Sequence, residues 1–552
     1  MSTFVRISVL SLAVVAGALF PLTLRAACKE DLGDGAMAAY QKGDFAAASR
    51  FFDEAIAAGL DDTSTLYNAA CSHALAGHAD EAFARLDTAI SKRFSACEML
   101  DRDADFASLR SDPRWKTMTA ACVKGNEEHA RFWNAGVWKS PYRENLPDAE
   151  KIAGLSRVWS EAKFNFVNFE LVPALDWDAA YQLYIPKALA TASTGEYYRV
   201  LEEFVALLKD GHSGVVPPKE LRDAVWSWPA ITTRLVEGRV FVREVLDPKL
   251  RADGIVPGLE IVEVDGVPVR RYAEAKVMPH VSASTPQDLE SRTFELDLLS
   301  GSAGSTVSVR LLDRNGKAST KSLARLAPVE RRTLEPKHPL AELEMLDGGV
   351  AYVNIRSFND ANVVTEFEAI IPQLAKAQAL VIDLRENGGG NSGNGDRILG
   401  MLTASEFPAQ RWWTREYRPA MRAWGNPEGR YDGASRVPGS GDKAWSGPIA
   451  LLTSARTYSA AEDFTVAFLG AKRGELIGEP TGGSTGQPLM FAVPGGGSVR
   501  ICSKRNTLVD GREFVGIGIQ PDLLVRPTVA DLRAGRDPVL DAAVKKLASS
   551  KR

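Results

Sequence analysis

Two short apolar runs, each followed by a turn and a helical pattern, constrain the fold of this chain most strongly. Residues 379–385 read Ala-Leu-Val-Ile-Asp-Leu-Arg, and residues 448–453 read Pro-Ile-Ala-Leu-Leu-Thr. Apolar runs of this length, bounded by turn residues, are typical of buried strands. Because strands and helical patterns alternate from about residue 345 onward, residues 335–545 are predicted to form an α/β core.

Ser459 stands where the second of these strands gives way to a helix. A serine at this place lies beside the free N–H groups of a helix N-terminus, which can stabilise a developing negative charge. Serine is also a common N-terminal helix cap. On this segment alone the cap is the better interpretation, and a nucleophile is the alternative.

A glycine triplet, Gly388-Gly389-Gly390, follows the first strand. Glycines between a strand and a helix let the backbone present N–H groups in a concave turn. The lysine and Ser/Thr of a phosphate-binding loop are absent after it. The triplet therefore favours a site for an oxyanion over a site for a phosphate.

His212 lies in the turn Asp210-Gly-His-Ser-Gly214, directly after a segment with helical periodicity. The flanking glycines leave this histidine free to project into a cleft. An isolated histidine in a loop is more often simply solvated. The turn alone does not decide between the two.

Residues 221–328 differ in character, because short β-rich runs replace the helical pattern. The run 254–269 reads as a strand, a tight Asp265-Gly266 turn and a second strand. This order of elements resembles a PDZ domain, which binds peptides by adding a strand to a sheet edge.

Residues 34–90 carry an internal repeat, within a helical domain predicted over 27–125. The motif that begins at Gly43 recurs at Gly77, 34 residues later, and Ala48 and Ala82 keep the same offset. This period resembles tetratricopeptide helical hairpins. A docking role for a protein partner and plain helical packing are equally compatible with it. A polar linker is expected over 124–150, followed by a helical segment over 140–220.

The chain begins with features of an export signal. Arg6 precedes an apolar run, and small residues follow that run near residue 26. Residues 1–26 are therefore predicted to be a cleaved signal peptide. A retained anchor and a lipid anchor at Cys28 are the alternatives. The protein is expected to be exported, either to a periplasm or to the outside, with no integral membrane span after cleavage.

Five cysteines and six histidines bound the possible cross-links and metal sites. Export would allow four of the cysteines, Cys28, Cys71, Cys97 and Cys122, to form two disulfides. Cys502 is expected to be a free buried thiol. No Cys/His spacing resembles a metal site, and no cofactor is expected. The net charge of -4 gives no polybasic reason to expect nucleic acid.

Several motifs in chain order together resemble peptidase family S41, the family of the C-terminal processing (tail-specific) proteases and the tricorn core protease. They are Asp210-Gly-His, the PDZ-like region, Asp383-Leu-Arg-Glu-Asn-Gly-Gly-Gly, Thr457-Tyr-Ser-Ala-Ala-Glu, Gly478-Glu-Pro-Thr-Gly-Gly and Gly516-Ile-Gly-Ile-Gln-Pro-Asp. The resemblance covers about residues 150–545. It implies a multidomain α+β protein whose helical repeat region, helical segment and PDZ-like domain accompany an α/β core of the ClpP/crotonase kind.

The resemblance also implies roles for individual residues. The processing proteases activate their serine with a lysine, but Ser484 stands at the equivalent position here. The tricorn-like branch uses a histidine from the segment before the PDZ-like domain, which is His212, and a late acidic residue, for which Glu513 is the choice. The oxyanion hole would consist of the Ala460 N–H and that of Gly389 or Gly390. A serine precedes the histidine in tricorn-like sites, and Gly211 replaces it here.

These implied roles predict an exported serine endopeptidase that acts on proteins or peptides. Ser459 would be the nucleophile, His212 the general base and Glu513 the residue that orients the base. The alternative is a catalytically inactive protein of the same fold that binds a peptide or an apolar ligand. A third possibility is that the repeats and the PDZ-like domain make the chain chiefly an adaptor.

Overall fold

The computed structural model describes residues 31–549, and the chain divides after Gly136 into two compact units. The predicted signal peptide, residues 1–26, lies outside the described residues. Within residues 31–549, no helix is both long and apolar enough to cross a membrane.

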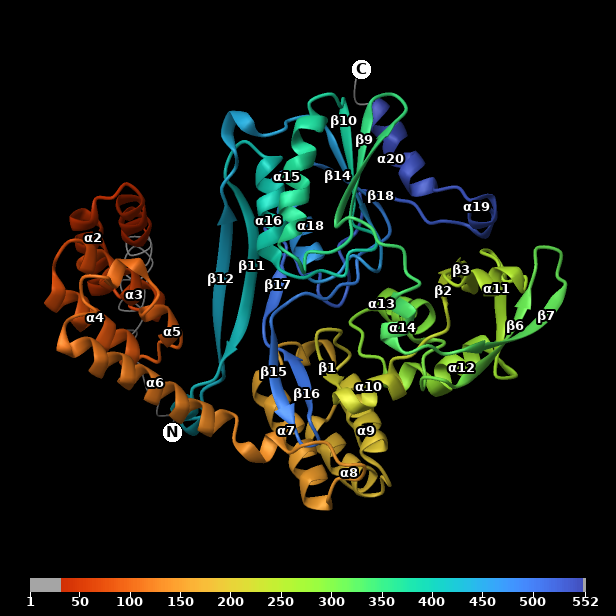
Figure 1. Ribbon diagram of the computed structural model, residues 1–552, viewed down its shortest axis with the longest axis horizontal. Coiled ribbons are helices and arrows are strands. Elements are labelled where there is room, and N and C mark those ends of the chain that lie inside the picture. The colour runs from red at the N-terminus through yellow and green to blue at the C-terminus, as the bar shows by residue number, and fades with distance from the viewer. Residues whose placement is uncertain (1–30, 550–552) are drawn as a thin grey trace, which may run out of the picture. The chain divides into compact units, whose positions relative to one another are not determined.

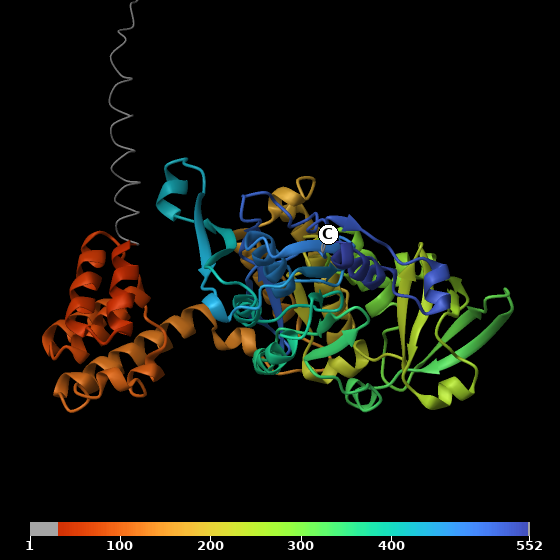
Figure 2. The ribbon, with the colours of Figure 1, turned by 90° about the horizontal axis from the view of Figure 1, so that it is seen from above.

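Unit 1 is made of helices that pack side by side (Figure 2). After a helix over residues 31–41, they are α2 (Phe45–Ala57), α3 (Thr63–Leu75), α4 (Ala79–Ser91), α5 (Cys97–Leu100), η1 (Ala104–Phe106) and α6 (Pro113–Trp133). Gly43 and Gly77 stand at equivalent turns with φ of 77° and 82°. Ala48 and Ala82 are both fully buried, so the sequence repeat corresponds to a repeated helix-turn-helix geometry. Their assignment as tetratricopeptide repeats stays a prediction.

The cysteines of unit 1 differ from the expected pairing. Cys97 and Cys122 form a disulfide that ties α5 to α6, whereas Cys71 is a free buried thiol. Cys28 lies outside the described residues. The expectation of two disulfides is therefore wrong for Cys71, while Cys502 is free and buried as predicted.

The expected linker is shorter than predicted, because α6 runs on to Trp133. A 3-10 turn, η2 (Gly136–Lys139), and an extended stretch then lead to α7 (Asp148–Asn165). Polar composition at 124–133 reflects the solvent-exposed side of a helix rather than a loop.

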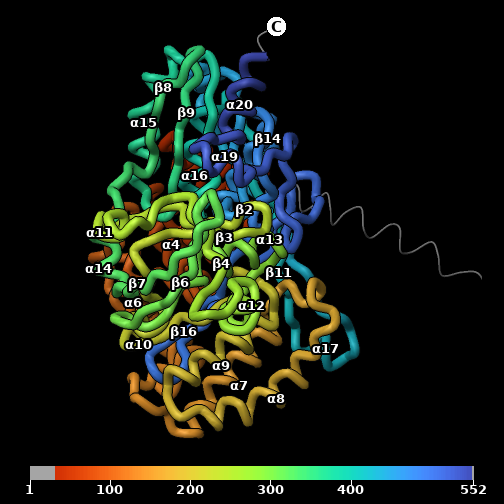
Figure 3. The backbone as a smooth tube through the Cα atoms, turned by 90° about the vertical axis from the view of Figure 1, so that its right-hand side faces the viewer, coloured from red at the N-terminus to blue at the C-terminus, as the bar shows by residue number. Residues whose placement is uncertain are grey.

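Unit 2 begins with the helical segment, which contains α7, η3 (Phe169–Leu171), α8 (Trp177–Leu189), α9 (Thr194–Ala206) and α10 (Lys219–Val225). Its aromatic residues are mostly core, as expected, and Trp177 stacks on Phe204 with ring centroids 4.2 Å apart. A short strand, β1 (Gly214–Val216), pairs antiparallel with β16 (Gly497–Cys502) of the α/β core. In Figures 1 and 3 the helices α7 and α9 accordingly lie next to β16.

The β-rich region forms a six-stranded sheet in the order β2-β3-β4-β6-β7, with β5 paired to β4. Its elements are β2 (Ile231–Val236), β3 (Arg239–Val245), α11 (Pro248–Ala252), β4 (Glu260–Val264), β5 (Val267–Pro268), α12 (Val269–Lys276), η4 (Met278–His280), α13 (Pro286–Ser291), the π-helix η5 (Arg292–Asp297), β6 (Thr306–Leu312), β7 (Ala318–Ala324) and α14 (Pro328–Arg332). The predicted Asp265-Gly266 turn joins β4 to β5, and both residues have positive φ. We call this region the β-domain; its PDZ assignment stays a prediction.

The α/β core contains a six-stranded sheet in the order β18-β14-β13-β10-β9-β8. Five strands run parallel, and β8 pairs antiparallel with β9. Helices α15, α16 and α18 cover one face and α20 covers the other (Figure 1). The elements are β8 (Ala341–Leu346), β9 (Val350–Ile355), α15 (Asn362–Leu374), β10 (Ala379–Asp383), α16 (Ser392–Met401), β13 (Ile449–Thr453), α18 (Ala460–Gly470), β14 (Gly474–Gly478), β18 (Leu523–Leu524), α19 (Val529–Ala534) and α20 (Pro538–Ser549).

Burial on both faces explains the unbroken apolar runs of the central strands. Leu380 and Ile382 face the helices α15, α16 and α18, whereas Ala379 and Val381 face α20. Successive side chains of a strand point to opposite faces, so residues 379–382 are all apolar. Asp383, at the end of β10, is buried with the polar partners Tyr352 and Arg385.

Two smaller sheets complete the core. The first has the order β1-β16-β15, with β15 spanning Pro488–Val493, and the second has the order β12-β11-β17. The second consists of β11 (Phe407–Glu416) and β12 (Gly429–Val437), with α17 (Pro419–Ala423) between them, and of β17 (Arg505–Thr507); η6 (Gly441–Lys443) follows β12. These sheets fix the chain between residues 488 and 507, which borders the candidate site.

Candidate active site

Ser459 occupies a strained turn between β13 and α18. Its backbone has φ of 57° and ψ of -123°, a conformation that costs a non-glycine residue about 1–3 kcal/mol. The surrounding loop holds it there, because its N–H donates to the carbonyl of Ser484 at 3.1 Å. The hydroxyl lies 2.9 Å from His212 Nε2. Ser459 is also the N-cap residue of α18, as expected, and its backbone N–H donates to the side chain of Glu462 at 3.3 Å. The helix cap and the contact with His212 are therefore both present.

His212 is 5% exposed and reaches Ser459 from the turn after α9. Its Nε2 lies 2.9 Å from the Ser459 hydroxyl, and its Nδ1 lies 2.8 Å from the Ser484 hydroxyl. Its ring stacks on that of Tyr458, with centroids 5.2 Å apart and planes within 5°. The side chain of Asp210 accepts the His212 backbone N–H at 3.0 Å. The imidazole is thus fixed on both nitrogens and on one face.

Glu513 does not contact His212, contrary to the expectation. Its Oε2 accepts a hydrogen bond from Arg505 Nε at 2.9 Å, and its side chain is 38% exposed. Arg505 is 4% exposed and also pairs with Glu170. A buried guanidinium needs carboxylate partners, and Glu513 fills that role.

The hydroxyl of Ser484 is the group beside His212 Nδ1, where the acidic third residue of the triad was expected. The buried carboxylate of Glu462 accepts the N–H groups of Gly483 and Ser484 at 2.8 and 2.9 Å and the Thr481 hydroxyl at 2.5 Å. Burial raises the pKa of Glu462 to about 7. This carboxyl group therefore positions the loop that carries Ser484, rather than touching the imidazole itself.

The electrostatic surroundings keep His212 neutral. Burial lowers its pKa to about 3, and the positive charges of Arg500, Arg292 and Lys504 add to this effect. With Nδ1 protonated and donating to Ser484, Nε2 is free to accept a proton from Ser459.

The glycine triplet lies against the nucleophile. A Cβ added to Gly389 would lie 2.7 Å from the Cβ of Ser459, so only glycine fits. The N–H of Gly389 donates to the Asn387 side chain at 2.9 Å and is already engaged. Within residues 31–549, the N–H groups of Gly390 and Ala460 donate to no protein acceptor. Of the two glycines that were predicted, Gly390 is therefore the better oxyanion donor.

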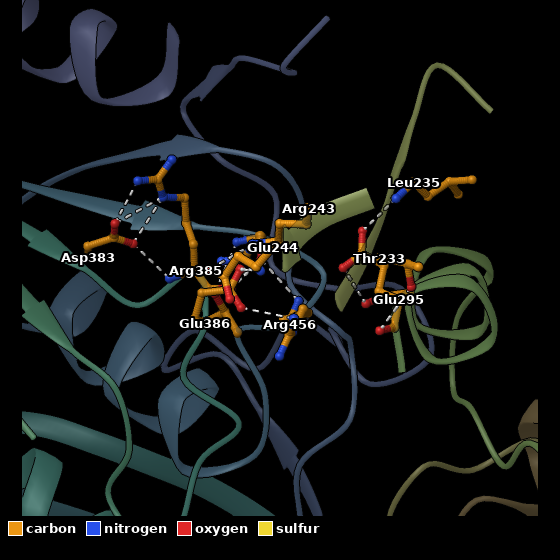
Figure 4. Close-up of polar contacts among 12 residues, drawn as sticks. Thr233, Leu235, Arg243, Glu244, Glu295, Asp383, Arg385, Glu386 and Arg456 are labelled. Carbon is orange, nitrogen blue, oxygen red and sulfur yellow. Dashed lines mark hydrogen bonds and ion pairs between the residues drawn. The ribbon is translucent and has the colours of Figure 1, made fainter. Parts of the chain in front are cut away.

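Ion pairs anchor the segment that leads into the triplet (Figure 4). Arg385 binds Asp383 at 2.6 Å and Asp537 at 2.7 Å. Glu386 binds Arg243 of the β-domain and Arg456 of the nucleophile turn, each at 2.9 Å. Both turns of the site are thereby tied to each other and to the β-domain.

Gly211 is required by a neighbouring tyrosine. A Cβ at this position would lie 1.9 Å from the Tyr458 hydroxyl oxygen and 2.9 Å from Asp288 Oδ2. The Tyr458 hydroxyl thus fills the space that a side chain at 211 would need, which accounts for the departure from the tricorn-like pattern.

In the described part of the chain, one cysteine and acidic cluster has metal-ligand spacing, and it lies in unit 1. Ligand atoms of Cys71, Asp103 and Asp105 fall within 4.8 Å of one another. Burial raises the pKa of the Cys71 thiol, so a metal that bound there would have to displace the thiol proton.

Sequence reasoning missed the roles of Ser484 and Tyr458. Ser484 was recognised only as the absence of a lysine, although the position itself was a signal. In the processing proteases this position carries the lysine that reaches the nucleophilic serine. A side chain at the same position is therefore also close enough to reach a histidine that is hydrogen-bonded to that serine.

Comparisons with known proteins identify relatives of this chain. Residues 349–525 match the model of peptidase family S41. The chain is 24% identical over 396 residues to the putative tricorn protease homolog 2 of Streptomyces coelicolor, covering 67% of this chain and 30% of that protein. It is 26% identical over 242 residues to the chloroplastic C-terminal processing peptidase of Tetradesmus obliquus, covering 42% of this chain and 49% of that one. It therefore spans less than half the length of either relative.

A solved structure shares the fold. Mature CPAF superimposes with a TM-score of 0.58 at 15% identity, covering 73% of this chain and 96% of that chain. At this identity the likeness concerns the fold alone.

Proposed function

We propose that this chain, which carries a domain of peptidase family S41, is a serine endopeptidase in which Ser459 is the nucleophile and His212 the general base. One observation carries the proposal: the 2.9 Å contact between the Ser459 hydroxyl and His212 Nε2. The two residues are 247 positions apart and come from different parts of unit 2. A serine held in a strained turn against a buried, neutral imidazole is the arrangement that nucleophilic catalysis needs.

The acylation step follows from these contacts. The Ser459 oxygen attacks the carbonyl carbon of the scissile peptide while Nε2 takes the hydroxyl proton. The carbonyl oxygen becomes an oxyanion that the N–H groups of Ala460 and Gly390 stabilise. Each such donor is worth about 3–4 kcal/mol in comparable sites.

The same groups complete the reaction. His212 returns the proton to the leaving amine as the C–N bond breaks, which leaves an acyl-enzyme on Ser459. Water then attacks the ester carbonyl and gives its proton to Nε2, and collapse of the second intermediate releases the acid and the free serine.

The partner of Nδ1 separates this site from triads with a carboxylate. The Ser484 hydroxyl can fix the tautomer and the orientation of the ring, but it carries no negative charge to stabilise the imidazolium. The proposed mechanism therefore relies on positioning more than on charge neutralisation at Nδ1.

Ser459→Ala is the decisive variant. We expect purified full-length protein to cleave an unfolded polypeptide and to be labelled at Ser459 by a fluorophosphonate probe, and we expect the variant to do neither. Ser319→Ala, at an exposed position of β7, is the matched control and should behave as wild type. Equal cleavage by Ser459→Ala would refute the proposal. Absence of labelling together with binding of an apolar ligand or an uncleaved peptide would favour the inactive binding protein.

We also propose that the protein is exported, to a periplasm or to the outside. The Cys97–Cys122 disulfide supports this, because such bonds persist mainly in oxidising compartments. Cell fractionation with a thiol-labelling assay tests it. Recovery of the protein in the cytoplasm with Cys97 and Cys122 reduced would contradict export.

A further inference from the structure

The cavity in front of Ser459 has an unusual charge balance. It has a volume of about 780 Å³ and is lined by Ser459 and His212 together with three cationic side chains: Arg292, Arg500 and Lys504. One carboxylate, that of Asp463, borders the same space.

Arg292 is compensated within the protein. Its Nε binds Asp288 at 2.6 Å, and its guanidinium lies over the Tyr458 ring, 4.7 Å from the centroid. Arg292 therefore supports the ring that packs on His212, and Asp288 compensates its positive charge.

Arg500 and Lys504 are compensated less than Arg292. Arg500 donates to the carbonyl of Gly211 at 3.3 Å, and Lys504 donates to the side chain of Gln410 at 3.5 Å. Lys504 also lies over the Trp412 ring, 5.5 Å from its centroid. Within the described residues neither cation has a carboxylate oxygen within 4.0 Å. Both are only partly exposed, and both line the cavity.

Asp463 attracts Lys504 and offsets part of its charge, but its hydrogen bonds go to other groups. It accepts the hydroxyls of Ser392 and Thr485 at 2.6 and 2.9 Å and the amide of Asn506 at 2.7 Å. Burial raises the pKa of Asp463, against the opposite effect of these hydrogen bonds and of Lys504.

We propose that the substrate of this site carries a carboxylate close to the scissile bond, which Arg500 and Lys504 bind. The proposal rests on the peptidase function proposed above and adds a substrate class to it. Arg500 lies on β16 and Lys504 lies two residues beyond the end of that strand, so both cations come from one short segment beside the turn of His212. An acidic side chain and a free C-terminal carboxylate share this chemistry.

The same two cations give the bound carboxylate a second effect. They disfavour the protonated form of His212, which must form when the imidazole takes the serine proton. A substrate carboxylate between them would offset this repulsion. Acidic substrates are thus expected to gain in turnover as well as in binding.

The test uses matched peptides based on one cleavage site found in an unfolded protein. Each flanking position carries either Glu or Gln, the ends are acetylated and amidated, and a second set has a free C-terminal carboxylate. Affinity is measured on the full-length Ser459→Ala protein, and kcat/KM on the Ser459 protein. We expect a preference of about tenfold or more for the charged member of one pair, which corresponds to about 1.4 kcal/mol.

Variants assign the preference to the two cations. Arg500→Gln and Lys504→Gln should each reduce the Glu-to-Gln ratio toward one while the Gln peptide still binds, and Lys504→Glu should favour a Lys peptide instead. Arg512→Gln, at a side chain that is 76% exposed, is the control and should keep the ratio. Because Arg500 also supports Gly211, the Lys504 variants keep the test valid if Arg500→Gln disturbs the turn.

The outcomes are distinct. A preference for internal Glu identifies an acidic side chain, and a preference for the free terminus over the amide identifies a C-terminal carboxylate. Equal affinity of the Ser459→Ala protein for every matched pair would overturn the proposal, whether or not the Ser459 protein cleaves peptides. Failure of peptidase function shows separately, as absence of turnover despite charge-selective binding.

Discussion

The nucleophile and its base reach the candidate site by two different routes. The α/β core supplies Ser459 and the glycine triplet through its own topology, because β13 and β10 are neighbouring parallel strands whose carboxyl ends meet. The helical segment supplies His212 from outside, through the pairing of β1 with β16 and the turn at Asp210. One half of the site is thus inherent in the sheet, and the other depends on tertiary packing.

The largest effects should come from removing either half. Ser459→Ala and His212→Ala are each expected to lower kcat by a factor on the order of 10⁴ or more, because the two groups act as one unit. For the same reason the double variant should be barely worse than either single one. Steady-state kinetics with one fluorogenic peptide measures all three. Additive losses in the double variant would show that serine and histidine act independently and would contradict the proposed mechanism.

The contrast between the two halves also explains what could be predicted from sequence. The runs at 379–385 and 448–453 predicted β10 and β13 within a residue or two, because an unbroken apolar strand reports burial on both faces. The hairpin of β11 and β12 and the three-residue β1 were not anticipated. β1 pairs with β16 and β11 also pairs with β17, both far away in sequence, and local patterns carry no record of that pairing.

The residue that orients His212 shows the same limit. Choosing Glu513 relied on the expectation that an acidic residue late in the chain faces the imidazole. The buried Arg505 instead determines where Glu513 points, and Glu462 determines where Ser484 points. Such choices among neighbouring side chains follow from packing, and spacing along the chain does not reveal them.

Ser484→Ala sharpens this distinction. Removing the hydroxyl leaves the Nδ1–H of His212 buried without an acceptor, which costs about 1–3 kcal/mol. We therefore expect kcat/KM to fall by about 10- to 100-fold, with the fluorophosphonate reaction slowed to a similar degree. Glu513→Gln is the control and should change activity little, because Glu513 lies at Arg505. The reverse ranking of the two variants would restore Glu513 as the third residue.

Gly211→Ser tests how tightly the turn that carries His212 packs against Tyr458. Because the added Cβ would meet the Tyr458 oxygen at 1.9 Å, the turn or the tyrosine must shift at a cost of about 1–3 kcal/mol. The shift should lower activity by about tenfold and reduce the thermal midpoint. Tyr458→Phe removes the clashing oxygen, so the double variant should recover part of the loss. Recovery is measured against Tyr458→Phe alone, and its absence would mean that the Asp288 contact dominates.

The pH dependence of the labelling rate should show that His212 is buried. Because the pKa of His212 is lowered to about 3, the unprotonated imidazole persists far below the usual value of 6.5. The rate of fluorophosphonate labelling, which needs no charged substrate, should thus stay level well below pH 6.5. Arg500→Gln removes a positive neighbour and should move the acid limb to higher pH. A limb near pH 6.5 in both proteins would show that the imidazole is solvated.

The same shift makes a prediction for stability. Between pH 6.5 and about 3 the unfolded chain binds a proton at this histidine that the folded protein does not, so this residue destabilises the fold as the pH falls. His212→Gln should remove this contribution from the curve of unfolding free energy against pH, measured by urea unfolding. The contribution of Glu462 has the opposite sign, but it is present in both proteins and cancels in the comparison. A curve that is unchanged in His212→Gln would indicate that the folded imidazole titrates normally.

Unit 1 should matter least to the chemistry. No residue of the site comes from residues 31–136, and the disulfide Cys97–Cys122 closes within this unit. A variant that begins at Val137 should therefore cleave a short peptide with kcat/KM within about twofold of the full chain, which is about 0.4 kcal/mol. The rate on a folded protein substrate is the second measurement, because a docking role would appear only there. A large loss on the short peptide, with the variant still folded by circular dichroism, would show that unit 1 supports the catalytic machinery and does not serve docking alone.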